Sequence, residues 1–192
     1  MKQKILMDAL WHIGRVRPEQ VLAPIYGSAW RYRHRARLSV REVAKKGTVL
    51  VGFHEKRSSF IADMKSCEIL PKRVSDLLVP LRELINSLTL RKKIPQIELA
   101  VTDEALALVL RVLEKPTTED EAKLRQFQED YGVDFWYQPK GPDSIYLMDP
   151  ENANRLKLHH RETGVEVVFR PTDFTQVNHR LNEVMVTRAL RL

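Results

Sequence analysis

The chain has 192 residues, 43% of them hydrophobic, and carries a formal net charge of +7. Its apolar content can bury the core of one domain or slightly more, which favours a globular protein over a disordered one. The longest purely apolar run, 105–110, is far shorter than the roughly 20 residues of a membrane span, and residues 1–10 lack a signal-peptide pattern. A single cysteine excludes an internal disulfide, so we expect a cytoplasmic protein without a membrane partner, and the basic charge favours a polyanion such as nucleic acid.

The first segment, 1–29, is expected to be a helical appendage. Apolar residues at positions 5, 6, 9, 10 and 13 predict an amphipathic helix that ends at Gly14, and Pro18 and Pro24 then mark a loop. Alternating patterns next predict a short antiparallel meander. Its expected strands are 35–41, 48–53 and 59–63, with Lys45-Lys46-Gly47 as the first turn.

From the strand at 59–63 onward the expected elements follow a regular order. They are a helix at 73–88, strands at 96–101 and 106–113, a helix at 118–131 and a strand at 133–138. Thr118 and Glu121 are expected to form a capping box at the start of the second helix, and Gly132 to end it. This is the ferredoxin-like β-α-β-β-α-β order, which predicts an α+β fold whose antiparallel sheet has helices on one face, preceded by the β-meander.

The closing part of the chain is predicted to be a loop, two short strands and a last helix. Residues 139–154 are rich in turn formers. Residues 169–178 follow the final strand and are expected to open the helix, where unpaired backbone N–H groups could meet a ligand. The helix has an apolar face that must pack against another surface. That face consists of Val177, Leu181, Val184, Met185 and Leu192.

The start of this last helix carries side chains suited to a small ligand. Gln176 and Asn178 can each donate and accept hydrogen bonds, and Phe174 can stack on a flat group. The alternative is ordinary helix capping by Thr172 or Asp173, with Phe174 as a hydrophobic staple.

A basic patch is predicted around the first strand of the sheet. Its members are Arg33, Arg35, Arg37, Lys56 and Arg57. The three arginines share one strand face, and guanidinium groups suit bidentate contacts with phosphate. Trp30 and Tyr32 add surfaces on which unpaired bases could stack. The alternative is a solvated edge strand whose charges prevent aggregation.

Cys67 is the one residue that suggests a metal ligand. It follows a strand and precedes a proline-led helix, but the six histidines show no ligand spacing. The local pattern therefore favours an inert, buried cysteine. No glycine-rich phosphate loop, Ser/His/Asp arrangement or carboxylate pair is found, so no catalytic residue is assigned.

Four blocks of sequence, taken in order, resemble the middle of the bacterial 23S ribosomal RNA uracil-C5 methyltransferases. They are YRHRARLSV (32–40), VGFHEKRSSFIADMKSC (51–67), IPQIELAV (94–101) and FRPTDFTQVN (169–178). Members of that family have an N-terminal RNA-binding barrel, a central domain with a 4Fe-4S cluster and a C-terminal domain that binds S-adenosylmethionine.

The resemblance implies three parts and a few site residues. Residues 1–29 would belong to the margin of the methyltransferase domain, 30–168 would be the central iron-sulfur and RNA-binding domain, and 169–192 would start a truncated S-adenosylmethionine-binding domain. By the same resemblance, the RNA-facing residues are Arg37 and Phe174, the fourth cluster ligand is Cys67 and the S-adenosylmethionine contact is Gln176.

The implied function is methylation of C5 of a uridine in 23S ribosomal RNA. The family's nucleophilic cysteine and catalytic glutamate, and three further cluster cysteines, have no counterpart in this chain. We therefore expect the chain to supply RNA grip and one cluster ligand, to be inactive alone, to retain neither cofactor, and to need no obligate protein partner. Two alternatives are a stand-alone basic RNA-binding module and a structural ribosome-associated protein.

Overall fold

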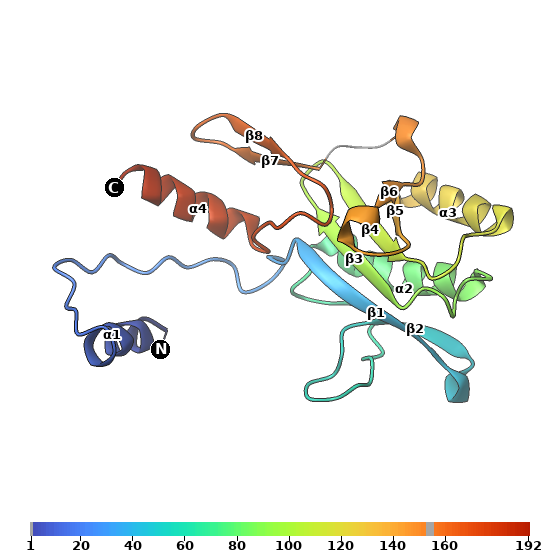
Figure 1. Ribbon diagram of the computed structural model, residues 1–192, viewed down its shortest axis with the longest axis horizontal. Helices are drawn as coiled ribbons and strands as arrows, with labels where there is room; N and C mark the ends of the chain where they lie inside the picture. The colour runs from blue at the N-terminus through green and yellow to red at the C-terminus, as the bar shows by residue number, and fades with distance from the viewer. Residues whose placement is uncertain (1, 153–155) are drawn as a thin grey trace.

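The computed structural model describes residues 2–152 and 156–192. Its body is a six-stranded sheet in the order β2-β1-β3-β4-β5-β6, with two helices packed on one face (Figure 1). The strands are β1 (Arg35–Val43), β2 (Thr48–Gly52), β3 (Gln96–Val101), β4 (Leu106–Arg111), β5 (Asp134–Gln138) and β6 (Tyr146–Leu147). The helices are α2 (Lys72–Ser87) and α3 (Thr118–Tyr131), and short 3-10 turns lie at Ala44–Lys46, Pro142–Ser144 and Pro150–Asn152.

Alternation along the strands separates the two faces of the sheet. Leu38 of β1, Leu99 of β3 and Leu108 of β4 are buried in one cluster with apolar residues of both helices. This cluster is the core, because the helices cover only that face and exclude water from it. The neighbouring positions of each strand, such as Arg37 and Glu98, point to the opposite face. We call it the open face, although Leu156 and Phe169 cover it at Ala100 and Ala107.

The α+β class and the placement of the helices on one face are confirmed, while two details differ from expectation. The sheet is mixed, because α3 crosses over and returns the chain so that β5 runs parallel to β4. The expected strand at 59–63 contributes only an isolated bridge between His54 and Ile61. There the chain crosses close over the end of β2, where a Cβ on Gly52 would lie 2.8 Å from the Ala62 carbonyl oxygen.

The helix α3 has its predicted bounds, but its capping box lies one residue earlier than predicted. Thr117, not Thr118, is the N-cap, and its capping-box partner is Asp120. Burial raises the pKa of Asp120, but hydrogen bonds from Thr89 and Thr117 outweigh it and hold the pKa below its ordinary value. The carboxylate thus ties the turn after α2 to the start of α3. Gly132, with a positive φ of 59°, ends α3 as predicted.

The remaining elements lie to one side of the body (Figure 1). They are α1 (Lys2–His12), the hairpin β7 (Lys157–His160) and β8 (Val165–Val168), and α4 (His179–Leu190). Neither α1 nor α4 has a buried residue. None of the helices in the described ranges has the length and apolarity needed to cross a bilayer.

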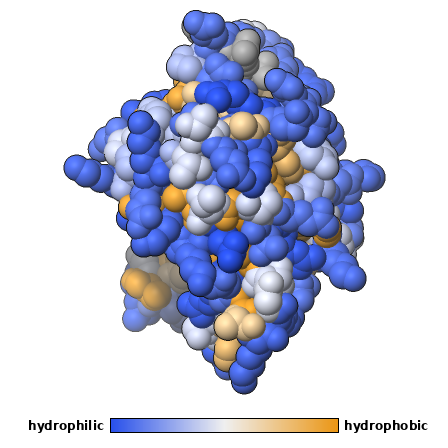
Figure 2. Space-filling model, turned by 90° about the vertical axis from the view of Figure 1, so that its right-hand side faces the viewer, coloured by the Kyte–Doolittle hydropathy of each residue, from blue (hydrophilic) through white to orange (hydrophobic). Residues whose placement is uncertain are grey.

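The apolar surface that the chain exposes is concentrated on these side elements. Large exposed hydrophobic residues include Ile5, Val167, Val184 and Met185. By contrast, the opposite end of the molecule is mainly hydrophilic with scattered apolar spots (Figure 2). Of the expected apolar face of the last helix, Val184, Met185 and Leu192 are exposed, whereas Val177 and Leu181 are half-buried.

The last helix begins later than predicted. It starts at His179, and its N-cap is Asn178, whose side chain accepts from the Leu181 amide at 3.0 Å. Thr172 and Asp173 do not cap it. The segment 169–178 is therefore a loop that precedes the helix, not its first turn.

Candidate functional site

The open face of β1 carries two of the three predicted arginines. Arg35 lies opposite Ala100 and Arg37 opposite Glu98 in the β1–β3 register, while Ala36 between them is buried in the core. Arg33 precedes the strand and is half-buried. Its amide donates to the Ile69 carbonyl at 2.9 Å, and its Nε is buried without a hydrogen-bond partner among the described residues.

Arg37 is the most open of the three. Its side chain is 66% exposed and pairs with Glu98, whose side chain is 14% exposed, at 2.8 Å. The Arg37 Nε donates to the same carboxylate oxygen at 3.1 Å. One carboxylate oxygen occupies only one side of the guanidinium, so donors remain for an incoming phosphate.

Arg35 is committed to the protein itself. Its guanidinium donates to the carbonyl oxygen of Pro171 at 2.9 Å and to that of Asp173. Burial lowers the pKa of Arg35 from its ordinary value, and the carboxylates of Glu98 and Asp173 act in the opposite direction. The structure therefore separates two arginines that the sequence pattern treats alike.

Lys56 and Arg57 lie at the exposed tip of the loop after β2. Two contacts bring this loop to the open face, since Arg41 donates to the Ser59 carbonyl at 3.2 Å and Ser39 lies 2.9 Å from His54 Nε2. The loop and Arg37 consequently stand on the same side of the sheet.

Cys67 lies in a loop that is held by Arg31. The Arg31 guanidinium donates to the carbonyl oxygens of Cys67 and Leu70 at 3.1 and 3.2 Å, and to Glu68 at 2.8 Å. The Cys67 amide donates to Ser75 Oγ at 2.9 Å, and its side chain packs against the core. Arg31 itself has a positive φ of 58°, which is unusual outside glycine.

The residues of this chain do not fit a 4Fe-4S cluster by themselves. Such a cluster is normally held by four thiolates, and the sequence has one cysteine. Within residues 2–152 and 156–192, no group of three or more His, Cys, Asp or Glu residues could hold a metal ion.

The loop 169–178 begins with a closed turn. The Arg170 amide donates to Asp173 Oδ2 at 2.7 Å, its guanidinium contacts Oδ1 at 3.1 Å, and the Asp173 amide donates back to the Arg170 carbonyl at 2.9 Å. The backbone hydrogen bond from Arg170, followed by its side chain, lowers the pKa of Asp173. Beyond the turn, Phe174 is 85% exposed and Gln176 is exposed. The side-chain amide group of Gln176 makes no hydrogen bond with the described residues.

The far end of this loop is attached to the start of β1. The His34 amide donates to the Val177 carbonyl at 2.8 Å, and the His34 ring stacks on His179. Burial, followed by the charge of His34, lowers the pKa of His179 to about 4, while Asp103 acts in the opposite direction. Local spacing could not reveal these contacts, because the partners lie far apart in the sequence.

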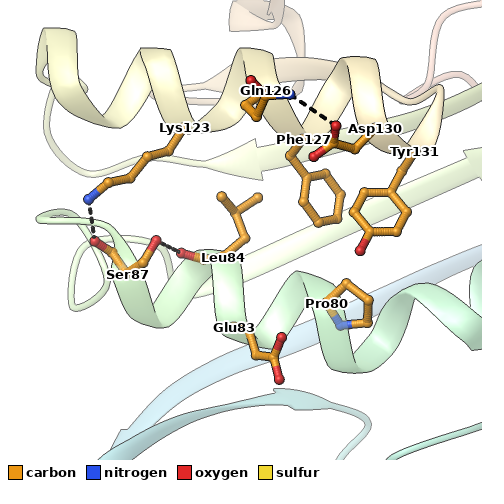
Figure 3. A pocket seen from close by; sticks show the side chains of 9 residues that line it. All are labelled: Pro80, Glu83, Leu84, Ser87, Lys123, Gln126, Phe127, Asp130 and Tyr131. Atoms are coloured by element: carbon orange, nitrogen blue, oxygen red, sulfur yellow. Dashed lines mark hydrogen bonds between the residues drawn. The ribbon is translucent and has the colours of Figure 1, made fainter.

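Gln176 and Arg37 line neither of two shallow cavities in the described part of the molecule. One, of about 280 Å³, lies between α2 and α3 (Figure 3). There Lys123 donates to the Ser87 carbonyl at 3.0 Å and Gln126 to Asp130 at 2.9 Å. The other, of about 430 Å³, lies between the irregular segment at Leu22 and Ala23 and α4.

No protein-family model matches the chain. Over all 192 residues it is 56% identical to proteins named 23S rRNA (uracil(1939)-C(5))-methyltransferase RlmD from Burkholderia lata and Cupriavidus necator, of which it covers 41% and 43%. The chain thus spans about two fifths of the length of these relatives.

A solved structure shares the fold. It is that of Pyrococcus abyssi tRNA (uracil-54, C5)-methyltransferase in complex with S-adenosyl-L-homocysteine. The match has a TM-score of 0.58 at 16% identity and covers 86% of this chain and 42% of that one.

Proposed function

We propose that the chain, which belongs to the family of 23S rRNA (uracil-C5)-methyltransferases, serves as the RNA-binding part of such an enzyme. Its substrate is then a uridine of 23S ribosomal RNA, methylated at C5 with S-adenosylmethionine as methyl donor. Acting on ribosomal RNA, it works in the cytoplasm and needs no obligate protein partner.

Arg37 is the observation that carries this proposal. It is an exposed arginine, held by one carboxylate, on a sheet face to which the Lys56–Arg57 loop is also tied. Positive groups in such an arrangement bind the phosphate backbone and position the RNA, without reading its sequence. Phe174, exposed in the neighbouring loop, offers a ring on which a base near the target uridine can stack.

Gln176 is proposed to contact S-adenosylmethionine. Its exposed amide has unused donors and acceptors, and the shared-fold relative was solved with S-adenosyl-L-homocysteine, the product of methyl transfer. Gln176 is exposed and lines neither of the two cavities described above. The chain alone is therefore expected to bind this cofactor weakly or not at all.

Cys67 is proposed as one cluster ligand, with the other thiolates supplied from outside this chain. When bound, the cofactor S-adenosylmethionine supplies the methyl group, and a nucleophilic cysteine and a base act on the uracil ring. We place that nucleophile and base outside this chain as well. The role of this chain is to bind phosphates and to orient the RNA, so alone it should transfer no methyl group.

The salt dependence of RNA binding tests the proposal. A 23S ribosomal RNA fragment is titrated with the chain and with Arg37→Ala at several salt concentrations. Loss of one phosphate contact should reduce the slope of log K against log salt by about 1. Arg125→Ala, which removes another exposed arginine paired with a glutamate, Glu121 of α3, is the control and should leave the slope unchanged. Equal slopes for all three proteins would reject the assignment.

A further inference from the structure

Arg35 and Arg37 stand two residues apart on the same strand face but in opposite environments. Arg37 faces solvent and pairs with a side chain. Arg35 is half-buried and donates to two main-chain carbonyl oxygens, those of Pro171 and Asp173. A guanidinium that is already shared between two carbonyl groups has little capacity left for phosphate.

The two carbonyl groups belong to the closed turn of residues 170–173. Hydrogen bonds between Arg170 and Asp173 fix the shape of that turn, and Pro171 is buried. Because Arg35 donates hydrogen bonds to the backbone of the turn and not to a side chain, it fixes the position of the whole turn relative to β1. The turn is thus rigid within itself and attached to the sheet through Arg35.

Phe174 and Gln176 follow this turn directly. The next residue, Val177, accepts from the amide of His34, which precedes Arg35 in the sequence. The short segment 174–176 therefore lies between two attachment points. Arg35 holds the turn before it, and His34 holds Val177 after it. Removing one attachment point should free one end of the segment.

We propose that Arg35 is a positioning residue, which holds the loop of Phe174 and Gln176 at a fixed place relative to Arg37. The position of the loop follows from geometry alone, whereas its use for RNA and cofactor rests on the proposed function. Lysine cannot replace Arg35 fully, since one ammonium lacks the planar fork that reaches both carbonyl groups.

Amide exchange measured by NMR on the 192-residue chain tests the position of the loop. The reporting amides are those of Asp173, bonded within the turn, and His34, bonded to Val177. Arg35→Ala should speed their exchange by about tenfold or more, Arg35→Lys by less, and Arg37→Ala not at all. Amides of β3 and β4 should stay protected in every variant.

Several results would overturn the proposal. One is unchanged exchange of both reporting amides in a folded Arg35→Ala, and another is an equal increase in Arg37→Ala. If the amides of β3 and β4 lose their protection from exchange in Arg35→Ala, that variant is not properly folded, and Arg35→Lys is used for the test. Loss of protection of the β3 and β4 amides in Arg35→Lys as well would show that Arg35 is needed for folding, and would reject a positioning role.

The salt slope of RNA binding separates this proposal from the proposed function. Arg35→Ala should leave the slope unchanged, whereas a decrease of about 1 would make Arg35 a phosphate contact and contradict the proposal. If Arg37→Ala also leaves the slope unchanged, the RNA role fails, while the exchange result still decides the role of Arg35.

Discussion

The imidazole rings of His34 and His179 stack with their centroids 4.4 Å apart and their planes at 21°. His34 immediately precedes β1, and His179 is the first residue of α4, so the stack attaches the last helix to the sheet. His179 Nε2 is buried without a partner among the described residues. A ring buried in this way is neutral at pH 7, because protonation would place a charge beside His34 in a poorly solvated site.

Acidification should therefore destabilise the protein through His179. Its folded pKa of about 4 lies below the ordinary value of 6.5, so the unfolded chain takes up the proton first. The stabilisation is present above about pH 6.5 and is lost as the pH falls towards 4. Asp63 and Asp173 have lowered pKa values too, but they lose their contributions below their ordinary value of 3.8.

Thermal unfolding midpoints between pH 7.5 and 4 measure this effect. His179→Phe keeps a flat ring against His34 and cannot take up a proton, so its midpoint should fall less steeply over the window. An identical pH profile for the two proteins would show that His179 does not cause the loss.

Asp120→Ala should be strongly destabilising. The Asp120 carboxylate accepts from the Thr89 amide at 2.7 Å, from the Thr89 hydroxyl at 2.5 Å and from the Thr117 amide at 3.3 Å. Loss of a helix cap together with unpaired buried donors costs about 2–4 kcal/mol. Urea unfolding gives the free energy directly. Asp130→Ala, on an exposed part of the same helix, should cost under about 0.5 kcal/mol, and similar losses for both variants would contradict the role of Asp120.

Arg31→Ala should make Cys67 more reactive towards a thiol reagent. Arg31 ties together the carbonyl oxygens of Cys67 and Leu70, so its removal should loosen the loop that half-buries the thiol. A rise of about tenfold in the labelling rate is expected from local opening. Arg57→Ala is the control, because Arg57 also has a positive φ but lies exposed at the tip of the loop after β2. Equal labelling rates for wild type and Arg31→Ala would show that Arg31 does not hold the Cys67 loop in place.

Sequence periodicity was sufficient to predict those elements whose structure is determined by residues close to each other in the sequence. The pattern of 96–101 predicted β3 with its observed bounds, and Gly132 marked the end of α3 because a left-handed residue ends helices. Neighbouring residues alone do not decide which threonine caps α3. Thr117 and Thr118 each have an acidic residue three positions on, and the structure uses Asp120 because its carboxylate also reaches Thr89.

Long-range contacts account for most of what the sequence could not predict. Alternation placed Arg35 and Arg37 on one face, but only the return of residues 171–173 covers one of them and leaves the other open. Within the described chain, the segment 59–63 pairs only with residues 53–55, through the isolated His54–Ile61 bridge, and Phe60 is 69% exposed. The predicted roles of Gln176, Cys67 and Phe174 came from resemblance, and the geometry explains how their loops are held.

Methyl transfer by a chimera tests the central claim most directly. This chain replaces the matching segment of the Burkholderia lata relative, and transfer of labelled methyl groups from S-adenosylmethionine to 23S ribosomal RNA is measured beside the parent protein. The proposed function predicts methylation at C5 of a uridine by the chimera, slowed at limiting RNA by Arg37→Ala. A chimera that is folded, as judged by its circular dichroism, yet transfers no methyl group would contradict it.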